Sequence, residues 1–440
     1  MSIKVSKFGG SSLANSKQYQ RVYDIVHEDR TRKFIVASAP GKSHSDDTKI
    51  TDLLYLCYDL AAHNINFHET LDIVEKKFRE IVENIGVDFD LDASIQILKE
   101  ELDSGKSRDH IASRGEFIGS QILAKYLGYE FVDAKELIFF DDRGQFMEKK
   151  SYDKIYELRK TDKNYVIPGF YGIMPNGEIK TFSRGGGDLT GSIISRGVKT
   201  DLYENWTDVT GIMSADPRIV KNPRNVEMIT YRELRELSYA GASVLHEEAI
   251  LPVTHAGIPI EIKNTFHPED KGTFIVPDND IEVQKMTRGV TGIAGRKHFS
   301  VVNIEKVRMN QDKGFHRKLM SVIEVNDMKV EHMPTSIDSI SLIIADKYLQ
   351  GRVDSLVSEI NTFCNPDIIK ITSNIALISV VGRGMKNHIG VSANLFTALA
   401  KDNINIQMII QGSSELNIIV GIHEDDYEKA IRAIYNAFLD

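Results

Sequence analysis

Cysteine is almost absent from this sequence. Of its 440 residues only two are cysteines, Cys57 and Cys364, and the 13 histidines form no HExxH or similar ligand set. This composition predicts neither a disulfide framework nor a zinc site, and we expect no metal bound by the protein alone. A reducing compartment fits best, so the expected location is the cytoplasm.

Long apolar runs are missing as well. The stretch from Ile375 to Val381 is among the most apolar, is broken only by Ser379, and is far too short to span a bilayer. The first residues, Met1 to Val5, lead into a strand-like pattern without the apolar core of a signal peptide. We therefore expect no membrane partner and no secretion signal.

The chain has no excess of basic charge. Its 54 Lys and Arg residues are outnumbered by 63 Asp and Glu residues, which gives a net charge of −9. A nucleic-acid partner usually requires a basic patch or stripe, so none is expected. A nucleotide ligand remains compatible with this charge, because a few local basic residues suffice to bind one. The length exceeds one ordinary core and predicts about three domains.

In the first two-thirds of the chain, short apolar strands alternate with longer helical patterns. Strand candidates are Phe34–Ala37, Tyr165–Ile167 and Ile258–Ile262, and helical stretches include Tyr19–Val26 and Arg232–Leu237. This alternation predicts an α/β fold, an open and mainly parallel sheet sandwiched by helices. Turns that follow its strands should meet at the carboxyl edge, where such sheets bind ligands.

Two glycine-rich turns far apart in the sequence carry the first sign of chemistry. Lys7-Phe8-Gly9-Gly10-Ser11-Ser12 comes near the end of the predicted strand Ile3–Phe8, and Ser183-Arg184-Gly185-Gly186-Gly187-Asp188 follows Lys180–Phe182. Glycine amides can cradle phosphate oxygens, and a lysine beside them supplies a point charge. Either motif alone is weak, since Lys7 can be an exposed residue before a turn and Asp188 the N-cap of a helix beginning at Leu189. Together they indicate an enzyme that handles a nucleoside triphosphate.

Further charged residues follow other predicted strands. Thr207 and Asp208 come after the strand Leu202–Trp206, and Lys263 follows the strand that ends at Ile262. The lysine could meet phosphates from the other side, and charge neutralisation is most of what phosphoryl transfer requires. Asp216-Pro217-Arg218 is either an ordinary turn or places Arg218 on a phosphate.

One helical carboxylate is a further candidate. Glu116 lies beside a glycine in a helical stretch that runs to Leu127. In an active-site helix this carboxylate could pair with a substrate ammonium group. Taken singly, a solvated glutamate is the simpler interpretation.

The last third contains an internal repeat. A shift of 76 residues superimposes Val302 on Ile378 and Gly314 on Gly390, and the segment 278–298 before it reads as a boundary. Each copy predicts strand, glycine turn, helix, strand, strand, helix, a small α+β unit in tandem. Such pairs bind a ligand at their interface or are purely structural duplications. Gly382-Arg383-Gly384 imitates a dinucleotide fingerprint, but the third glycine is replaced by Asn387.

Together these motifs resemble aspartate kinases of the amino-acid kinase superfamily, over nearly the whole chain. The segments that carry the resemblance are Lys7–Ser12, Val36–Ala39 with Thr51-Asp52, Ser238–His246, Ile260–Phe266 and Gly272-Thr273. The repeat resembles paired ACT domains, with Gln411–Glu415 typical of the second copy. The resemblance implies a kinase domain at 1–285 and ACT domains at 298–370 and 371–440, the second completed by the 298–306 strand and the first inserted within it.

The resemblance also implies a reaction and a set of site residues. ATP with Mg²⁺ would phosphorylate the β-carboxylate of L-aspartate to 4-phospho-L-aspartate, the first step towards lysine, threonine and methionine. The catalytic residues would be Lys7, Lys263 and Asp188. ATP would bind at Lys7, Gly9, Gly10, Ser11, Thr207, Asp208, Met213, Arg218, Lys263 and Asn264. Aspartate would bind at Ser38, Thr51, Glu116, Arg184 and Gly187. Gly187 and Met213 depart from the serine and tyrosine usual in the family, but neither change removes a charge, so we expect activity to survive.

The ACT pair implies feedback by a pathway end product, most often lysine. The pocket would comprise Met309, Asp312, Gly314, Phe315, Val330, Glu331, Thr335 and Ser336. Asp312 stands where the family frequently has serine, and an extra carboxylate there would suit a cationic effector. ACT units of this kind imply a homodimer or a dimer of dimers.

Three alternatives to this interpretation remain. Glutamate 5-kinase or uridylate kinase would share the α/β core but does not normally carry the ACT pair. An inactive amino-acid sensor would have lost Lys7, Lys263 or Arg184, and all three are present. A fusion to homoserine dehydrogenase would need several hundred more residues with a true dinucleotide fingerprint.

Overall fold

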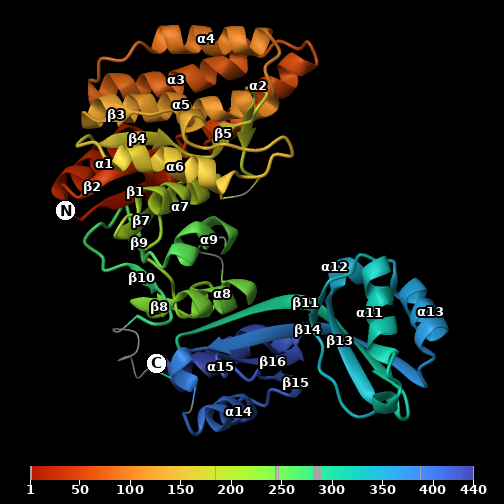
Figure 1. The fold of residues 1–440 in the computed structure, drawn as a ribbon. Helices are drawn as coiled ribbons and strands as arrows, with labels where there is room; N and C mark the ends of the chain where they lie inside the picture. Colours follow the sequence, from red (N-terminus) through yellow and green to blue (C-terminus); the bar gives the residue numbers. More distant parts are fainter. Residues whose placement is uncertain are drawn as a thin grey trace. The chain divides into compact units, whose positions relative to one another are not determined.

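A computed structural model of the chain describes residues 2–183, 185–242, 245, 247–280, 289–386 and 388–439. The chain divides into two compact units. The first comprises Met1–Ile212, Asn225–Tyr231 and Ser243–Lys285, and the second Met213–Arg224, Arg232–Ala242 and Met286–Asp440. Each unit has its own sheet and its own core (Figure 1).

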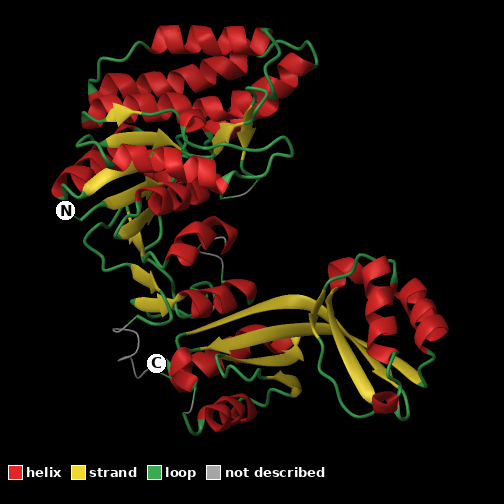
Figure 2. Ribbon diagram, viewed as in Figure 1, coloured by secondary structure: helices red, strands yellow, loops and turns green. Residues whose placement is uncertain are grey.

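The first unit is built on a sheet of eight strands in the order β3-β4-β2-β1-β7-β9-β10-β8. In this order, each strand from β3 through β4, β2, β1 and β7 to β9 runs parallel to its neighbour. Strand β10 runs antiparallel to β9 (Figure 2). The strands are β1 (Lys4–Phe8), β2 (Arg32–Ala37), β3 (Glu130–Phe131), β4 (Tyr165–Pro168), β7 (Leu202–Thr207), β8 (Met228–Thr230), β9 (Ile260–Asn264) and β10 (Thr273–Val276). A separate hairpin is formed by β5 (Tyr171–Ile173) and β6 (Ile179–Thr181). The predicted mainly parallel α/β fold is confirmed.

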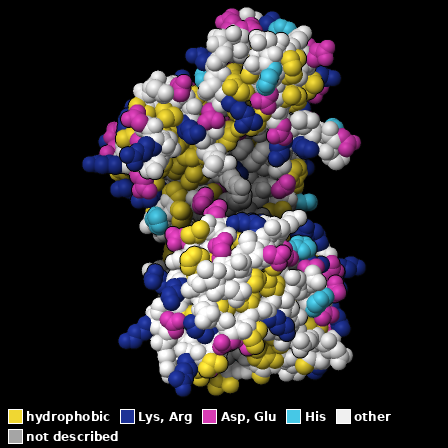
Figure 3. Space-filling view, turned by 90° about the vertical axis from the view of Figure 1, so that its right-hand side faces the viewer, with side chains coloured by type: hydrophobic (Ala, Val, Ile, Leu, Met, Phe, Trp, Pro, Cys, Tyr) yellow, Lys and Arg dark blue, Asp and Glu magenta, His cyan; other side chains and the backbone are white. Residues whose placement is uncertain are grey.

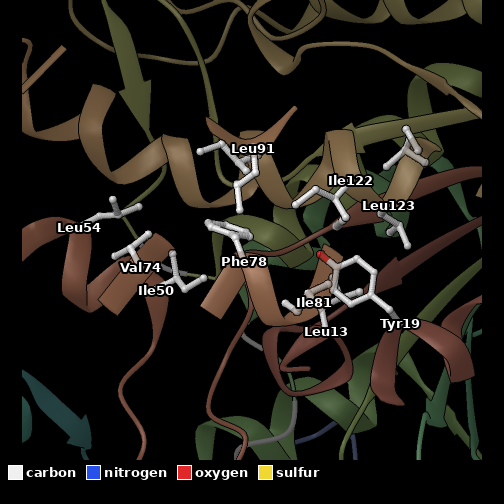
Figure 4. Close-up of a cluster of buried hydrophobic side chains, with 14 of the residues drawn as sticks. Leu13, Tyr19, Ile50, Leu54, Val74, Phe78, Ile81, Leu91, Ile122 and Leu123 are labelled. Carbon is white, nitrogen blue, oxygen red and sulfur yellow. The ribbon is translucent and has the colours of Figure 1, made fainter. Parts of the chain in front are cut away.

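Helices cover both faces of this sheet. One layer contains α1 (Ser16–Glu28), α2 (Ile50–Ala62), α3 (His68–Ile85), α4 (Leu91–Asp103) and α5 (Arg108–Leu127), with the short helices η1 (Gly10–Leu13) and η2 (Ala134–Glu136) nearby in sequence. The opposite layer contains α6 (Glu148–Arg159), α7 (Gly186–Val198) and α9 (Glu247–Ala256). Apolar residues spaced three and four apart form the core of the first layer, where side chains of four helices surround Phe78 (Figure 4).

Two local predictions need correction. Lys263 and Asn264 are the last residues of β9, not residues after a strand, because the strand begins at Ile260, two positions later than predicted. Helix α7 begins at Gly186 with Gly185 as its N-cap, so Asp188 lies in the first turn and is not the cap. Its carboxylate is therefore available to a neighbouring cation.

The second unit holds the internal repeat in one sheet of order β12-β13-β11-β14-β16-β15. Its strands are β11 (Gly292–Glu305), β12 (Val330–His332), β13 (Ser339–Ala345), β14 (Ile368–Val381), β15 (Ile406–Ile410) and β16 (Asn417–His423). Its helices are α11 (Phe315–Val325), α12 (Asp346–Leu349), α13 (Val353–Cys364), α14 (Val391–Lys401) and α15 (Tyr427–Phe438), with η3 (Met309–Gln311), η4 (Arg383–Met385) and η5 (Glu424–Asp426); α8 (Tyr231–Tyr239) also falls largely in this unit. Each copy follows the predicted order of elements.

The two copies share their longest strands. Phe299–Glu305 of β11 pairs with β13 and with the first half of β14, whereas Gly292–Arg296 pairs with the second half of β14. The strand that completes the second copy is therefore Gly292–Arg296, which differs from the 298–306 strand that the sequence predicted. The first copy is inserted between this strand and the rest of the second. His298, at φ +70°, lies where the register of β11 against β14 shifts.

Among the residues that the structure describes, none of the helices combines the length and the hydropathy needed to cross a membrane. On the face drawn in Figure 3, basic and acidic side chains are interspersed.

A buried carboxylate joins the central strands of the first unit. Glu204 on β7 is 0% exposed and accepts hydrogen bonds from Ser6 (2.8 Å) on β1, Arg32 Nε (2.8 Å) on β2 and the Trp206 indole (3.0 Å). Lys4 adds an ion pair at 3.1 Å. Burial alone would raise the pKa of Glu204, but the hydrogen bonds and charge of Arg32 outweigh it and lower that pKa.

We expect Glu204→Gln to lower the free energy of unfolding by about 3–5 kcal/mol at pH 7, because Arg32 would remain buried without its counter-charge. The wild-type contribution of Glu204 is present above the ordinary carboxyl pKa and is lost as the pH falls through its lowered folded value. Urea unfolding from pH 3 to 8 measures both the destabilisation by Glu204→Gln and the pH dependence of wild-type stability. Asp162→Asn, which removes an exposed partner of Lys33, is the matched control and should change nothing measurable. Equal stability of Glu204→Gln and wild type would contradict the assignment.

Candidate active site

The turns that follow the parallel strands meet at one edge of the sheet. Gly9 and Gly10 follow β1, Ser38 to Gly41 follow β2, and Gly169 follows β4. The Gly41 amide donates to the Gly10 carbonyl at 2.8 Å, and a Cβ on Gly41 would lie 2.6 Å from the Gly10 carbonyl carbon. Only glycine allows the two backbones to approach this closely.

Lys7 lies at this edge in an ion pair. Its side chain is 9% exposed, and Nζ lies 2.6 Å from Oδ1 of Asp188 in the first turn of α7. The same oxygen accepts a hydrogen bond from Asn205 Nδ2 on β7 at 2.9 Å. A Cβ on Gly9 would lie 3.4 Å from Lys7 Nζ, so the ammonium group sits against the glycine turn. The arrangement places a fixed cation beside backbone amides, as a phosphoryl group requires.

The glycines at the start of α7 face this lysine. A Cβ on Gly187 would lie 3.5 Å from Lys7 Cε and 2.8 Å from Ser38 Oγ. A serine at this position would thus force the Ser38 side chain to rotate, which gives a physical reason for glycine there. The positive end of the α7 dipole adds to the field of Lys7.

Glu116 is a buried carboxyl at this edge. It is 6% exposed on α5, and its Oε2 has no hydrogen-bond partner among the residues that the structure describes. Burial raises its pKa to about 8, although the side chain accepts a hydrogen bond from the Ala39 amide. Ala39 is next to Ser38, so Glu116 reaches the strand edge that holds Lys7. Such a group is poised to pair with a cation from a ligand.

Lys263 approaches the edge from the other face of the sheet. It is the register partner of Trp206, whereas Lys7 is the partner of Asn205. Successive strand residues point to opposite faces, so the two lysines lie on opposite faces at the strand ends. Lys263 Nζ donates to the Asp270 carbonyl at 2.7 Å.

Hydrogen bonds tie together the remaining residues of this edge. Thr207 Oγ1 donates to Asp208 at 3.2 Å, and the exposed Asp208 directly follows β7. Asn264 Nδ2 donates to Thr210 Oγ1 at 3.1 Å, which in turn donates to Asp270 at 3.0 Å. Gly10 and Ser11 lie in η1, half-buried.

Four further residues belong to the predicted site. Arg184 lies outside the described residues. Thr51 is half-buried in the first turn of α2. Met213 and Arg218 belong to the second unit, where the Arg218 side chain is 87% exposed and pairs with Asp216 at 2.6 Å.

The predicted effector residues fall in the first copy of the repeat. Met309 and Phe315 are buried in its core, and Gly314 caps α11. Asp312 pairs with Lys306 at 2.9 Å, and Glu331 pairs with Arg296 at 3.0 Å. Both carboxylates thus already form an ion pair with a basic side chain of the same protein. The other predicted members, in β12 and the turn after it, are Val330, Thr335 and Ser336.

Comparison with known proteins agrees with this architecture. A sequence profile of the amino acid kinase family matches residues 2–264, and a profile of the ACT domain matches residues 378–438. Aspartokinase 3 of Bacillus subtilis (strain 168) is 37% identical over 456 residues, covering 99% of this chain and 98% of that protein. The crystal structure of Clostridium acetobutylicum aspartate kinase is 51% identical with a TM-score of 0.91, and all of both chains is covered. E. coli aspartokinase III in complex with aspartate and ADP, at 22% identity and a TM-score of 0.71, shares the fold over the full length of both chains.

The family profile spans more than half of the chain, which therefore belongs to the amino acid kinase family. Within that family its full-length similarity is to aspartokinases, so the predicted assignment to the aspartate kinases, as a phosphotransferase enzyme, is confirmed.

Sequence reasoning missed two residues of this site. Asn205 fixes Asp188, and Trp206 lies beside Lys263 in the neighbouring strand. The signal for Asn205 was that it and Glu204 are two adjacent polar residues between the aromatic residues Tyr203 and Trp206 of one strand. Trp206, the only tryptophan of the chain, gave no local signal of its contacts.

The raised pKa of Glu116 makes a prediction about stability. Between the ordinary carboxyl pKa and about 8 the folded state binds a proton that the unfolded state lacks, so stability falls as the pH rises through this window. Glu116→Gln should therefore unfold at a higher urea concentration than wild type. Its free energy of unfolding near pH 8 should exceed that of wild type by roughly 2–4 kcal/mol. The difference should shrink as the pH falls towards the ordinary carboxyl range.

Glu83→Gln, at an exposed position of α3, is the control and should follow wild type at every pH. A constant offset between Glu116→Gln and wild type across the range would exclude a raised pKa as the cause.

Proposed function

We propose that this chain transfers the γ-phosphoryl group of ATP to the β-carboxylate of L-aspartate. The observation that carries the proposal is Glu116, a buried carboxyl at the edge that also holds Lys7, whose Oε2 has no hydrogen-bond partner among the described residues. The α-ammonium group of an amino acid would donate a hydrogen bond to that oxygen. The relatives and neighbours named aspartokinase support the same substrate.

The chemistry suits the groups that the site offers. The attacking β-carboxylate is ionised near neutral pH, so no general base is needed. Lys7 and Lys263 would neutralise phosphate charge from the two faces of the sheet, with Asp188 orienting Lys7. Ser38, Thr51, Arg184 and Gly187 would surround aspartate. Arg184 would grip the α-carboxylate through two parallel hydrogen bonds.

ATP would bind at the glycine turn and along the ends of β7 and β9. Mg²⁺ would arrive with ATP and supply charge neutralisation between its phosphates. The Asp188 carboxylate is already engaged by Lys7 and Asn205. The ion would therefore be held by the phosphate oxygens of ATP rather than by this carboxylate.

The ACT pair would sense an amino-acid end product of the pathway, and we propose lysine. A structure of E. coli aspartokinase III, similar in fold, contains lysine and aspartate. Asp312 and Glu331 would receive the effector, which must compete with Lys306 and Arg296 for these carboxylates. Assembly would be a homodimer or a dimer of dimers through the ACT units, and the location cytoplasmic.

ADP release should require both MgATP and L-aspartate. Lys7→Met should lower kcat by about a hundredfold or more, because the transition-state charge loses its fixed cation. Lys33→Met, which removes a lysine paired only at the surface, should leave kcat unchanged. Turnover with L-glutamate or UMP in place of aspartate would overturn the proposed substrate.

Lysine should inhibit this turnover, and Lys306→Met should strengthen the inhibition by several-fold, because it frees Asp312 for a cationic effector. Asp312→Asn should weaken it. The lysine concentration that gives half-inhibition is measured for wild type and for the two variants. The same titration with threonine tests it as a second candidate effector. Unchanged half-inhibition in both variants would place the effector elsewhere.

A further inference from the structure

Strand β7 presents two different surfaces to the two lysines of the site. Asn205 and Lys7 are register partners on the side that faces α7, and Trp206 and Lys263 are partners on the other. Lys7 has a carboxylate partner in Asp188. Lys263 forms no ion pair with any residue in the part of the chain that the structure describes. Its ammonium group is instead hydrogen-bonded to the Asp270 carbonyl and lies over the Trp206 ring, 5.7 Å from the centroid.

The Trp206 ring is held in one orientation. It is 1% exposed, stacks on Phe8 with 5.9 Å between centroids, and lies 5.3 Å from the Arg32 guanidinium carbon. Its indole N–H donates to Glu204 at 3.0 Å, and Glu204 is itself fixed by Arg32. A ring anchored at its edge and at its face cannot turn away from Lys263 without breaking a buried hydrogen bond.

The backbone of Trp206 also holds the glycine turn. Its carbonyl accepts a hydrogen bond from the Gly9 amide at 3.1 Å and a longer one from Ser12 Oγ at 3.5 Å. Ser12 in turn contacts Thr265 Oγ1 at 2.7 Å, beyond the end of β9. The same residue thus lies between the turn beside Lys7 and the strand that carries Lys263.

We propose that Trp206 is a positioning residue that aims the Lys263 ammonium group at the phosphates of the bound nucleotide. The ring face attracts the cation without neutralising it, and among the described residues no carboxylate forms an ion pair with Lys263. The Glu204–Arg32 pair holds the ring, so this buried network serves the site as well as the fold. The inference rests on the proposed role of Lys263 in nucleotide binding.

Three variants separate positioning from packing. Trp206→Leu removes the ring, and Trp206→Phe keeps an aromatic face but loses the hydrogen bond to Glu204. Phe34→Leu is the matched control, since Phe34 is 1% exposed on β2 and stacks on Tyr165 at 5.7 Å. Unfolding in urea, MgADP affinity by calorimetry, and the KM for ATP are measured for each full-length protein.

We expect all three variants to lose stability. Only Trp206→Leu should also weaken MgADP binding and raise the KM for ATP, by about tenfold, the factor equivalent to 1.4 kcal/mol. Trp206→Phe should restore both constants to near the wild-type values. Wild-type MgADP affinity in Trp206→Leu would overturn the inference, and so would a loss of affinity in Phe34→Leu as large as the loss in Trp206→Leu.

The calorimetric readout keeps this test separate from that of the proposed function. If wild type shows no aspartate-dependent turnover but binds MgADP, the proposed substrate fails while the Trp206 comparison still decides the inference. If turnover is normal and Trp206→Leu binds MgADP as wild type does, only the inference fails.

Discussion

The ionised carboxylate of Glu204, buried in the middle of the sheet, is the constraint on which the rest of the first unit depends. A charge in that position is costly unless donors surround it, and here they come from three adjacent strands: Ser6 on β1, Arg32 on β2 and Trp206 on β7. A slip of β1 or β2 by one residue relative to β7 would turn its donor, Ser6 or Arg32, to the opposite face. The network therefore fixes the register of β1, β2 and β7, and with it the positions at which their loops leave the sheet.

The register of the central strands determines which side chains lie next to one another at the edge of the sheet. Once β1 and β7 are aligned, Lys7 falls beside Asn205, and Asn205 holds Asp188 against the lysine. The next residue of β7 is Trp206, which alternation sends to the other face, next to Lys263. One strand thereby places two cations on opposite faces of the same edge. A phosphoryl group between them would be neutralised from two directions, as in-line transfer requires.

The sequence predicted the helices, strands and turns of this protein better than it predicted which strands pair and which side chains are in contact. Alternating strands and helices, the two glycine turns and the 76-residue repeat identified both units, because each is a local pattern with a fixed period. The role of Asp188 was undecided, since an N-cap and a lysine partner look alike in sequence, and the start of α7 at Gly186 decides between them. The strand Gly292–Arg296 and the contacts of Asn205 and Trp206 could not be predicted. They depend on pairing between segments far apart in the chain, and no local propensity encodes that pairing.

Glu204 and Glu116 show two opposite uses of a buried carboxylate in one domain. Glu204 is surrounded by donors, its pKa is lowered, and it stabilises the fold. Glu116 has one oxygen without a hydrogen-bond partner among the described residues, burial raises its pKa to about 8, and its ionised form therefore opposes folding. A buried carboxylate without donors is costly, because its charge is removed from water without compensation. Under the proposed function a ligand ammonium group would pair with this carboxylate and offset that cost on binding. The departure from good core design thus marks the site, as the agreement around Glu204 marks the scaffold.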